Sequence, residues 1–397
     1  MNKFILLLIS AVFIFINDWK LLYQISILIL VLIGVYYFFK QKKFGLKSIE
    51  KYVLYSFAAY SFSYLIYILN DIAFTFRDID HGSRFFLLIP LYFVFRDLKS
   101  FKFLDNLILF STLFTSTVVI INFFILDKHR AYNNSCISGA QVSLIFGILT
   151  LFISLKKNNL SRTIIFITAS IFAFIAVVLS QTRGVILCVP ILIILVIYLR
   201  YERINLKTLS LISLILTSLI FLGLQFIPEL KSRFNYTKNN VEILLDSIEE
   251  NQFHGSTSIT IRYNFQKYGF LAFLESPLWG SGRKGFRDEM THSGFNKNFL
   301  PHATHSHNQF ISDLVMRGLF GFLSTVIFMS YLIYTFVRLR RKGDYEFASY
   351  GLILVCSYIL FFLTDSPFIG SMHSTLFFIF CSLLFLSASF NEVEKKE

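Results

Sequence analysis

A succession of apolar runs fills almost the whole chain, and it constrains the fold more than any other feature. An α-helix needs about 20 apolar residues to cross the hydrocarbon core of a bilayer, and most of the runs come close to that length. Hydrophobic residues make up 55% of the chain and charged residues only 15%, a balance far from that of soluble globular proteins. The sequence therefore predicts an all-α polytopic integral membrane protein.

About twelve runs are long enough to be considered as membrane spans. The first and the fourth are short for a full crossing. Lys3 precedes the first run as in a signal peptide, but no small-residue cleavage site follows, so we interpret this run as a retained span. The runs centre on residues 4–16, 21–39, 52–69, 84–95, 107–126, 139–155, 163–180, 184–199, 208–227, 318–337, 347–364 and 370–390.

The basic residues indicate how the chain is oriented. The net charge of +13 does not point to nucleic acid, because Lys and Arg gather in short loops between the apolar runs. They are concentrated in one alternate set of loops, at residues 40–51, 96–102, 156–162, 200–207 and 338–342, and are sparse in the other set. By the positive-inside rule the basic set is cytoplasmic. Both termini are then cytoplasmic, and residues 228–317 form one large outer loop.

The chain accordingly divides into three parts: spans one to nine in residues 1–227, the outer loop domain in residues 228–317, and spans ten to twelve with a short cytoplasmic tail in residues 318–397. The outer loop is predicted to be helical. Apolar residues at helical spacing from Val241 to Ile248, behind Asn240 as an N-cap, predict a short amphipathic helix. A second helix is expected from about Ile259 to Glu275 and carries Arg262 near its start.

All eight histidines fall on the outer side or at the outer end of a predicted span. The length of the outer loop explains part of this distribution, so the count alone does not separate function from chance. The residues are His81, His129, His254, His292, His302, His305, His307 and His373.

Three of these histidines stand close together in His302-x-x-His305-x-His307, just before an apolar helix. Three interpretations compete. The spacing fits no strong zinc signature, which weakens a metal site. Structural histidines at a helix entry are common. The interpretation we favour is a general base, because an imidazole with a pKa of about 6.5 accepts a proton from a hydroxyl at neutral pH.

Arginines also mark the outer face. Arg183 lies in a turn of only a few residues between two spans, where an Arg is costly unless it snorkels to the surface or has a partner or ligand. Arg84, at the start of the fourth span, adds positive potential on the same side, as do Arg77, Lys128 and Arg130. Guanidinium groups pair bidentately with phosphate oxygens, so this face suits a phosphate or pyrophosphate.

A glycine-rich segment, Gly280-Ser-Gly-Arg283-Lys284-Gly285, matches the letters of a dinucleotide fingerprint. It lacks a preceding buried strand and a βαβ unit, so we reject a nucleotide site. Two interpretations stay open. The turn either holds an anion with its amides and with Arg283, or is an ordinary loop.

The residues resemble a known family. His307-Asn308, followed after nine residues by Gly318-x-x-Gly321, is similar to the motif of bacterial O-antigen ligases. Leu179-Ser-Gln-Thr-Arg183-Gly184, Arg262 and the helix end at Glu275-Ser-Pro277 also look like that family. Counted from His305, the glycine positions fall on Met316 and Leu319, so His307 is the histidine at the family's spacing. The resemblance covers most of the chain, and the wider superfamily includes O-antigen polymerases.

This resemblance implies a glycosyltransferase in the bacterial inner membrane with its active site facing the periplasm. O-antigen ligases transfer O-antigen polysaccharide from undecaprenyl pyrophosphate to a sugar hydroxyl of lipid A-core, completing lipopolysaccharide, with no metal and no cofactor. By position, His307 would be the general base, while Arg183 and Arg262 would bind the pyrophosphate and stabilise its charge as it leaves. Further candidates for substrate binding are Arg84, Arg283, His305 and Asn308.

Membrane lipids and the two lipid-linked substrates are thus the expected partners, and nucleic acid is not. Two alternatives remain. An O-antigen polymerase would use the same donor but usually has two large periplasmic loops, whereas only one is predicted here. A lipid-linked glycan flippase or other transporter would be expected to carry ionisable residues within its spans or an internal repeat, and neither is apparent.

Overall fold

In a computed structural model, the protein is all-helical over the residues that the structure describes, with no strand among them. The described residues are 2–17, 19–40, 47–70, 84–86, 89–96, 98, 101, 103–126, 135–156, 159–201, 228–249, 257–292 and 303–394. The predicted ninth span, 208–227, lies outside them.

The helices of the N-terminal part follow the predicted apolar runs closely, because each run supplies the uninterrupted apolar surface that a buried or lipid-facing helix needs. The fourth run contributes only one short described helix, α5. The helices are α1 (Asn2–Phe15), α2 (Lys20–Lys40), α3 (Ser48–Asn70), α5 (Ile89–Arg96), α6 (Phe103–Phe124), α7 (Cys136–Ser154), α8 (Leu160–Leu179) and α9 (Arg183–Arg200).

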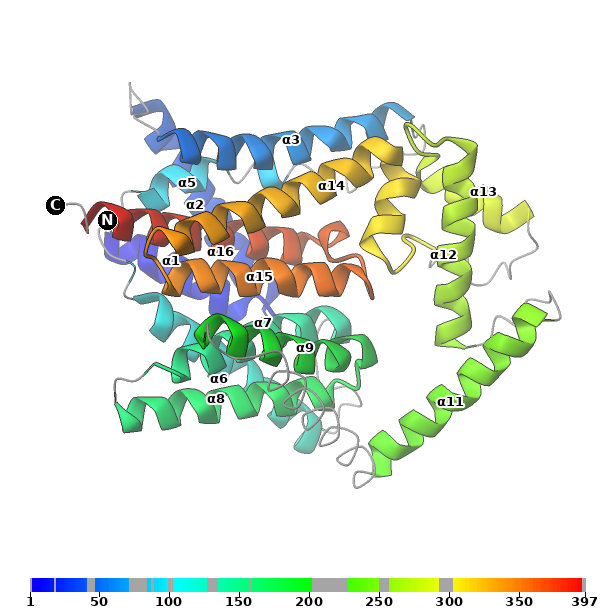
Figure 1. The fold of residues 1–397 in the computed structure, drawn as a ribbon, viewed down its shortest axis with the longest axis horizontal. Coiled ribbons are helices and arrows are strands. Elements are labelled where there is room, and N and C mark those ends of the chain that lie inside the picture. The colour runs from blue at the N-terminus through cyan, green and yellow to red at the C-terminus, as the bar shows by residue number, and fades with distance from the viewer. Residues whose placement is uncertain are drawn as a thin grey trace.

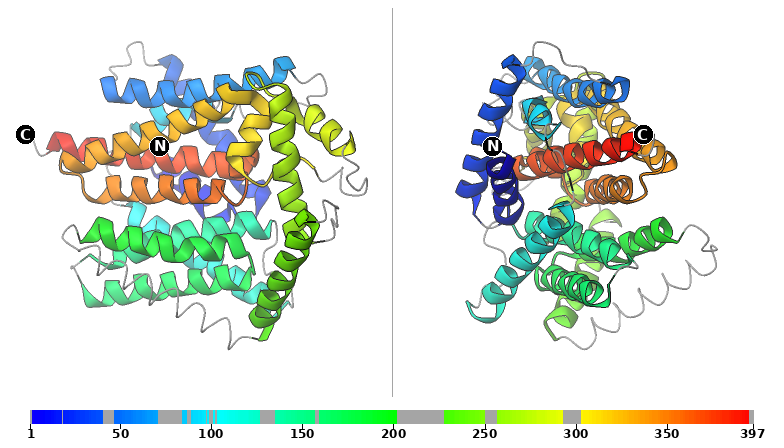
Figure 2. Two further views of the ribbon diagram at one scale, coloured as in Figure 1. Left: turned by 45° about the vertical axis from the view of Figure 1, so that its right-hand side comes forward. Right: turned by 90° about the vertical axis from the view of Figure 1, so that its left-hand side faces the viewer.

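The C-terminal part begins with three helices of the outer loop and ends with three further apolar helices. These are α11 (Pro228–Glu249), α12 (Ser258–Glu275), α13 (Gly282–His292), α14 (Gln309–Arg341), α15 (Glu346–Phe362) and α16 (Ser371–Glu394), with a short 3-10 turn η2 (Pro367–Ile369) between the last two. The long helices of the bundle run roughly side by side, and α11 and α12 cross one end of it (Figures 1 and 2).

Six of the described helices are long and apolar enough to cross a membrane, namely α2, α6, α7, α8, α9 and α14. Shorter apolar helices occupy Lys3–Phe15, Glu346–Phe362 and Ser371–Ser387. Among these six helices α7 is the most buried, with 78% of its most apolar window buried, because α6, α8, α9 and α15 all contact it. These helices form the apolar body beneath the outer loop.

The outer loop differs from the prediction in one respect. The helix ending at Glu275 is confirmed as α12, which begins at Ser258 behind a capping box of Thr257 and Thr260. The amphipathic helix does not start at Asn240, however. Helix α11 already begins at Pro228, so Asn240 lies within it and is not its N-cap. Proline fits the first turn of a helix, where its missing N–H is not needed.

One end of the bundle carries an ion-pair cluster. Asp105 at the start of α6 accepts hydrogen bonds from Lys156 Nζ at 2.9 Å, Arg162 Nη2 at 3.1 Å and the Tyr350 hydroxyl at 2.9 Å. Lys156 also pairs with Glu346 at 2.7 Å. The cluster joins α6 and α15 to the loop between α7 and α8, at the end that the sequence assigned to the basic loops.

Candidate active site

The site is built around the start of α14. Asn308 is the N-cap of this helix, and its side chain accepts hydrogen bonds from the amides of Phe310 at 3.0 Å and Ile311 at 3.2 Å. His307, directly before the cap, has φ of 55°. Residues other than glycine rarely adopt this left-handed backbone conformation, and those that do cluster at functional sites. The turn holds the His307 imidazole where a regular helix would not.

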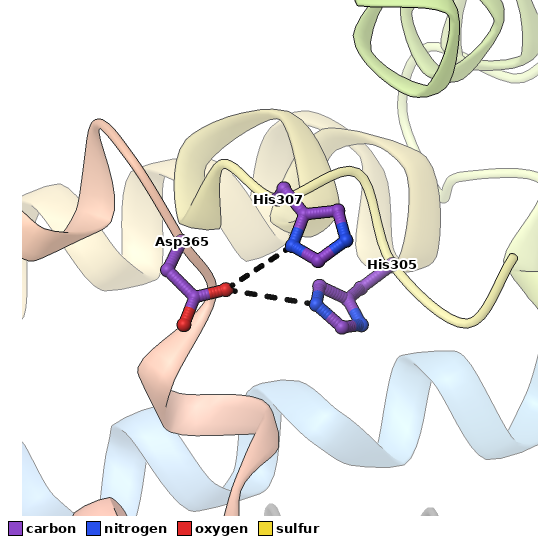
Figure 3. A group of neighbouring side chains, drawn as sticks. All are labelled: His305, His307 and Asp365. Carbon is purple, nitrogen blue, oxygen red and sulfur yellow. Dashed lines mark hydrogen bonds and ion pairs between the residues drawn. The ribbon is translucent and has the colours of Figure 1, made fainter. Parts of the chain in front are cut away.

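Three side chains converge beside this turn. His307 Nδ1 lies 3.3 Å from Asp365 Oδ1, and His305 Nε2 lies 3.7 Å from the same oxygen. The two imidazole centroids are 4.3 Å apart. Figure 3 shows both histidines, from the segment that precedes α14, pointing toward Asp365 in the connection between α15 and η2. Residues far apart in the sequence thus form one titratable cluster.

Two members of the cluster, Asp365 and His307, have shifted pKa values. Burial alone would raise the pKa of Asp365, but hydrogen bonds from His305 and His307 hold it well below its usual range, so Asp365 is an anion near neutral pH. Burial lowers the pKa of His307, and this outweighs the opposite effect of Asp365. A neutral His307 that donates from Nδ1 to the carboxylate keeps a lone pair on Nε2. This is the tautomer that a general base requires.

Helix α12 supplies two further groups to the same place. Phe265 is buried and stacks in parallel with the His307 ring, with centroids 6.0 Å apart and an interplanar angle of 2°. Arg262 lies one turn earlier on α12, close enough that its charge contributes to the low pKa of His307. The spacing of three residues places both side chains on one face of the helix.

Arg262 shares a cavity of about 320 Å³ with Arg183. Arg183 is the first residue of α9, and the turn Ser180–Thr182 that joins it to α8 is as short as the sequence indicated. Gln181 in this turn has φ of 54°. Arg183 also lies over the Tyr236 ring, 5.8 Å from its centroid. The structure therefore brings two arginines, from α9 and α12, to one cavity at the N-terminus of a helix, an arrangement that favours anions.

A larger cavity of about 530 Å³ is lined by all three members of the cluster, His305, His307 and Asp365. Arg283, from the first turn of α13, lines it as well. The two cavities adjoin, because Ile137 lines both and Thr364 of the smaller one precedes Asp365 of the larger one. The His307 cluster consequently lines the larger of two adjoining cavities, and the two arginines line the smaller one.

A break in α14 fixes the outer loop to the bundle. Gly318 has φ of 63° and ψ of −159°, which interrupts the helix. The segment after α12 fills the break: the Leu319 amide donates to the Pro277 carbonyl at 2.8 Å, and the Ser281 amide donates to the Val315 carbonyl at 2.9 Å. A Cβ at Gly318 would lie 2.3 Å from the Leu278 carbonyl oxygen. Only glycine fits here, for its backbone angles and for space.

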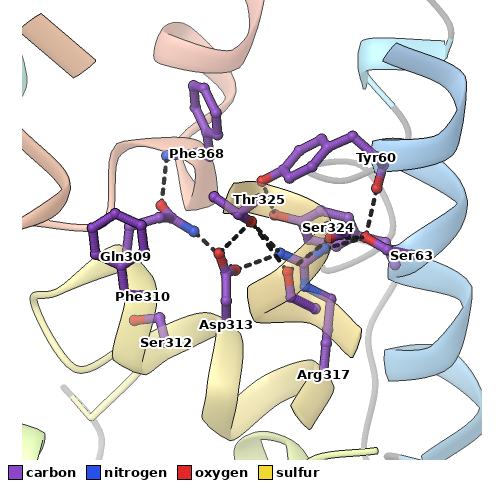
Figure 4. A network of polar contacts seen from close by, with 12 residues as sticks. Tyr60, Ser63, Gln309, Phe310, Ser312, Asp313, Arg317, Ser324, Thr325 and Phe368 are labelled. Carbon is purple, nitrogen blue, oxygen red and sulfur yellow. Dashed lines mark hydrogen bonds and ion pairs between the residues drawn. The ribbon is translucent and has the colours of Figure 1, made fainter. Parts of the chain in front are cut away.

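Below the break, a buried polar network surrounds Arg317 (Figure 4). Arg317 is 1% exposed and pairs with Asp313 at 2.5 Å, and it also donates to Ser63 of α3. Its guanidinium lies over the Tyr64 ring, 3.9 Å from the centroid. Asp313 accepts further hydrogen bonds from Thr325 at 2.6 Å and from Gln309 at 3.0 Å. The network ties both halves of α14 to α3.

The predicted site residues are therefore only partly brought together. His305, His307 and Arg283 line the larger cavity, and Arg183 and Arg262 line the smaller one. Arg84 lines neither of these cavities, and its Nη1 donates to Thr375 of α16 at 3.2 Å. Asn308 serves as a helix cap. The other outer residues named from the sequence, His81, His129, His254, His302, Arg77, Lys128 and Arg130, lie outside the described residues.

Sequence reasoning missed Asp365, and it gave Phe265 and His373 no part in the site. His373 on α16 lines the larger cavity. Of the glycine-rich segment, Gly282 opens α13 and Arg283 reaches the cavity, while Lys284 is exposed. Asp365 carried one signal in the sequence, because an ionisable residue between two apolar spans is rare without a partner.

The cluster also has the composition of a metal site. One ligand atom each from His305, His307 and Asp365 can be chosen so that all three lie within 4.8 Å of one another. Two imidazoles and a carboxylate are ligands that zinc and iron accept. The geometry thus allows a metal as well as a proton relay, and chelation separates the two.

The residues that form the site lie mainly in a segment shared with a known family. Residues 168–326 match the family described as O-antigen ligase. The resemblance to O-antigen ligases is confirmed. The matched segment contains Arg183, Arg262 and His307, whereas Asp365 lies beyond it. With the apolar helices of the bundle, this match indicates a multi-pass membrane protein.

Two relatives extend the comparison. An O-antigen ligase of Escherichia coli is 24% identical over 207 residues, which are 51% of this chain and 47% of that protein. A protein of Haemophilus influenzae, described as uncharacterized, is 28% identical over 385 residues, which are 92% of this chain and 93% of that protein. The similarity to this second protein therefore extends over nearly the full length of both chains.

Proposed function

We propose that the protein is an O-antigen ligase that transfers a polysaccharide from undecaprenyl pyrophosphate to a sugar hydroxyl of lipid A-core. The observation that carries this proposal is that His307 lines one cavity while Arg183 and Arg262 line an adjoining one, with Arg262 close enough to influence the pKa of His307. A base next to a pair of cations suits a reaction in which a hydroxyl loses a proton and a pyrophosphate leaves. The family match supports the same reaction.

In this proposal the donor pyrophosphate occupies the smaller cavity. Arg183 and Arg262 form charge-assisted hydrogen bonds with its oxygens, and these bonds strengthen as negative charge develops on the leaving group. Two positive groups from separate helices also fix the orientation of the bond that breaks. The Thr182 and Arg183 end of α9 adds the positive end of a helix dipole.

The acceptor hydroxyl approaches from the larger cavity. His307 Nε2 takes its proton, and the hydroxyl oxygen forms a bond to the anomeric carbon of the donor sugar. The bond between that carbon and the phosphate oxygen breaks, and undecaprenyl pyrophosphate leaves with the electron pair. Asp365 holds the His307 tautomer and stabilises the imidazolium that forms. One displacement inverts the anomeric configuration and needs no carboxylate nucleophile or metal.

The orientation of the chain belongs to the same proposal. About twelve spans with both termini in the cytoplasm place the residue 228–317 loop in the periplasm of a bacterium, in its inner membrane. The site residues at 183, 262, 305–307 and 365 would then face the periplasm. This orientation lets two lipid-linked substrates meet at the bilayer surface, where their glycans are in water and their chains in the membrane.

A transfer assay with purified protein tests the proposal. Wild-type protein in liposomes is mixed with lipid-linked O-antigen and lipid A-core, and the product is separated by gel electrophoresis. Ligation gives glycan attached to lipid A-core. Longer glycan on the lipid carrier would instead identify a polymerase, and glycan that crosses the bilayer without a new bond would identify a transporter.

A matched pair of variants on α12 connects the assay to the site. Arg262→Gln removes a charge that lines the donor cavity, whereas Lys267→Gln removes a charge from the same helix that lines neither cavity. Loss of one transition-state donor costs about 10²–10³ in rate, so Arg262→Gln should fall by that factor and Lys267→Gln should not. Equal rates for the two variants would count against the donor site.

A further inference from the structure

The larger cavity is lined by two cations that have no role in the proposed transfer step. Lys20, at the start of α2, and Arg283, in the first turn of α13, both line it. Among the described lining residues, Asp365 is the one carboxylate, and its oxygen is engaged by His305 and His307. Two cations from separate elements therefore line a space whose one described carboxylate already contacts two histidines, which favours an anionic occupant.

A buried histidine gives this cavity a second polar feature that the proposed reaction does not use. His373 is 2% exposed and lines the cavity, and its Nε2 has no hydrogen-bond partner among the described residues. The Tyr358 hydroxyl lies 3.2 Å from both the Nδ1 and the backbone carbonyl of His373. The phenol has one hydrogen, and a carbonyl only accepts.

These contacts allow two arrangements. When Tyr358 donates to the carbonyl, His373 donates from Nδ1 to the phenol oxygen and Nε2 is an acceptor; when Tyr358 donates to Nδ1, Nε2 carries the hydrogen and is a donor. A buried polar atom without a partner is costly, so the unpaired Nε2 of a residue that lines the cavity indicates a ligand group that pairs with it. A sugar hydroxyl, which both donates and accepts, is such a group. The hydroxyls of Ser135 and Ser138, at the start of α7, line the same cavity.

The size of the cavity agrees with a carbohydrate. Its volume of about 530 Å³ lies within the range of about 300–1,000 Å³ typical of pockets that enclose small ligands. The smaller cavity beside it already holds the two arginines assigned to the donor pyrophosphate. The larger one is thus available for the acceptor.

We propose that this cavity is an acceptor subsite selective for an anionic sugar, one that bears a phosphate or a carboxylate near the hydroxyl that reacts. The inference rests on the proposed ligase function, which by itself does not require a charged acceptor sugar. Lys20 and Arg283 bind the anionic group, and His373 Nε2 forms a hydrogen bond with a sugar hydroxyl. The acceptor is held by charge on one side and aligned with His307 on the other.

Binding of lipid A-core to the purified full-length protein in detergent tests this inference without any transfer step. Fluorescently labelled lipid A-core is titrated in three forms: native, dephosphorylated, and with its carboxylates converted to amides. We expect wild-type protein to bind one neutralised form at least about tenfold more weakly than the native form. The form that loses affinity identifies phosphate or carboxylate as the group recognised.

Two double variants complete the experiment. Lys20→Gln with Arg283→Gln should bind all three forms equally and as weakly as wild type binds the neutralised one. The control, Lys238→Gln with Lys284→Gln, removes two exposed charges that do not line the cavity and should keep the wild-type preference. Equal affinity of wild-type protein for all three forms would overturn the inference, as would an unchanged preference in the cavity variant.

The same protein samples separate this inference from the proposed function. Charge-dependent binding of lipid A-core by a wild-type protein that transfers no glycan would support the anionic subsite and contradict the ligase. Transfer at equal rates to native and neutralised acceptors, with equal KM values for them, would support the ligase and contradict the subsite. An increase in acceptor KM with unchanged kcat in the Lys20 and Arg283 variant is the kinetic result we expect.

Discussion

Two carboxylates near the start of α14, Asp313 and Asp365, differ in how closely their partners surround them. Asp313 is 3% exposed, and its oxygens accept hydrogen bonds from Arg317 at 2.5 Å, Thr325 at 2.6 Å and Gln309 at 3.0 Å. Asp365 lines a cavity, and its contacts to His307 and His305 are 3.3 and 3.7 Å long. A buried network with several short hydrogen bonds is rigid, whereas a looser cluster beside a cavity leaves its partners able to exchange protons.

The rigid region also holds the looser one in place. The Gln309 side chain donates to Asp313 and accepts a hydrogen bond from the Phe368 amide at 3.1 Å. Ser312 contacts Ser366 at 2.9 Å. These bonds fasten the connection that carries Asp365 to the first turn of α14, directly after His307. The start of α14 therefore carries a structural network around Asp313 and, next to it, the proposed catalytic cluster of Asp365 and His307.

The largest expected effect comes from breaking the buried network around Asp313. Asp313→Ala removes the partner of the buried Arg317, and an uncompensated buried charge destabilises a protein by about 3–5 kcal/mol. Thermal unfolding in detergent should show a clearly lower midpoint, and Asp288→Ala, an exposed carboxylate on α13, should not. An unchanged midpoint for Asp313→Ala would contradict the structural role of the Asp313 network.

The next largest effect separates activity from stability. Asp365→Asn keeps the shape of the side chain but removes the charge that holds the His307 tautomer. In a comparable triad, this change lowers kcat by about 10⁴, and we expect a loss of at least about 10² here. The unfolding midpoint should change much less than in Asp313→Ala. A large loss of stability with normal turnover would reverse the assigned roles of the two carboxylates.

The pH dependence of turnover should show the low pKa of His307. The base acts in its neutral form, and burial lowers its pKa below 6.5, so turnover should stay constant as pH falls to about that value. Below the lowered pKa, turnover should fall about tenfold per pH unit as the imidazole is protonated. Rate measurements from pH 4 to 8 test this. An acid limb that begins above pH 7 would show that burial does not control the titration.

The smallest effect is expected from chelation. If Asp365, His305 and His307 relay a proton, EDTA should leave transfer within about twofold of the untreated rate, because a relay of this kind needs no Lewis acid. Turnover before and after dialysis against EDTA, with zinc added back to one half of the sample, is the measurement. Loss of activity that zinc restores would replace the proton relay with a metal site.

The parts of the site that the sequence predicted are those with a local signal. Arg183 lies in a very short turn between spans, and His307 stands at a fixed spacing from Gly318 and Gly321. Asp365 carried only the signal of an ionisable residue between two apolar spans, and nothing in the sequence joined it to His307, because the two lie 58 residues apart and only tertiary packing brings them together. The break at Gly318 was also missed, since a Gly-x-x-Gly pair within an apolar run is equally typical of close helix packing.

The fold shows the same division. Apolar runs with helical length predict where α6, α7 and α8 lie, because burial or lipid contact alone determines those helices. The start of α11 at Pro228 was not predicted, because its first turns are polar and have no apolar period. How α12 crosses the bundle depends on hydrogen bonds between the 276–281 segment and the break in α14, which the spacing of residues does not encode.

In the proposed reaction His307 takes the acceptor proton, and the neighbouring His305 does not. Single-turnover transfer by purified protein, loaded with lipid-linked glycan and mixed with lipid A-core, tests it most directly through His307→Ala and His305→Ala. We predict that His307→Ala folds, binds donor and transfers at least about 10² times more slowly than wild type, and that His305→Ala loses less. Transfer by His307→Ala at the wild-type rate would contradict the role of His307 as general base.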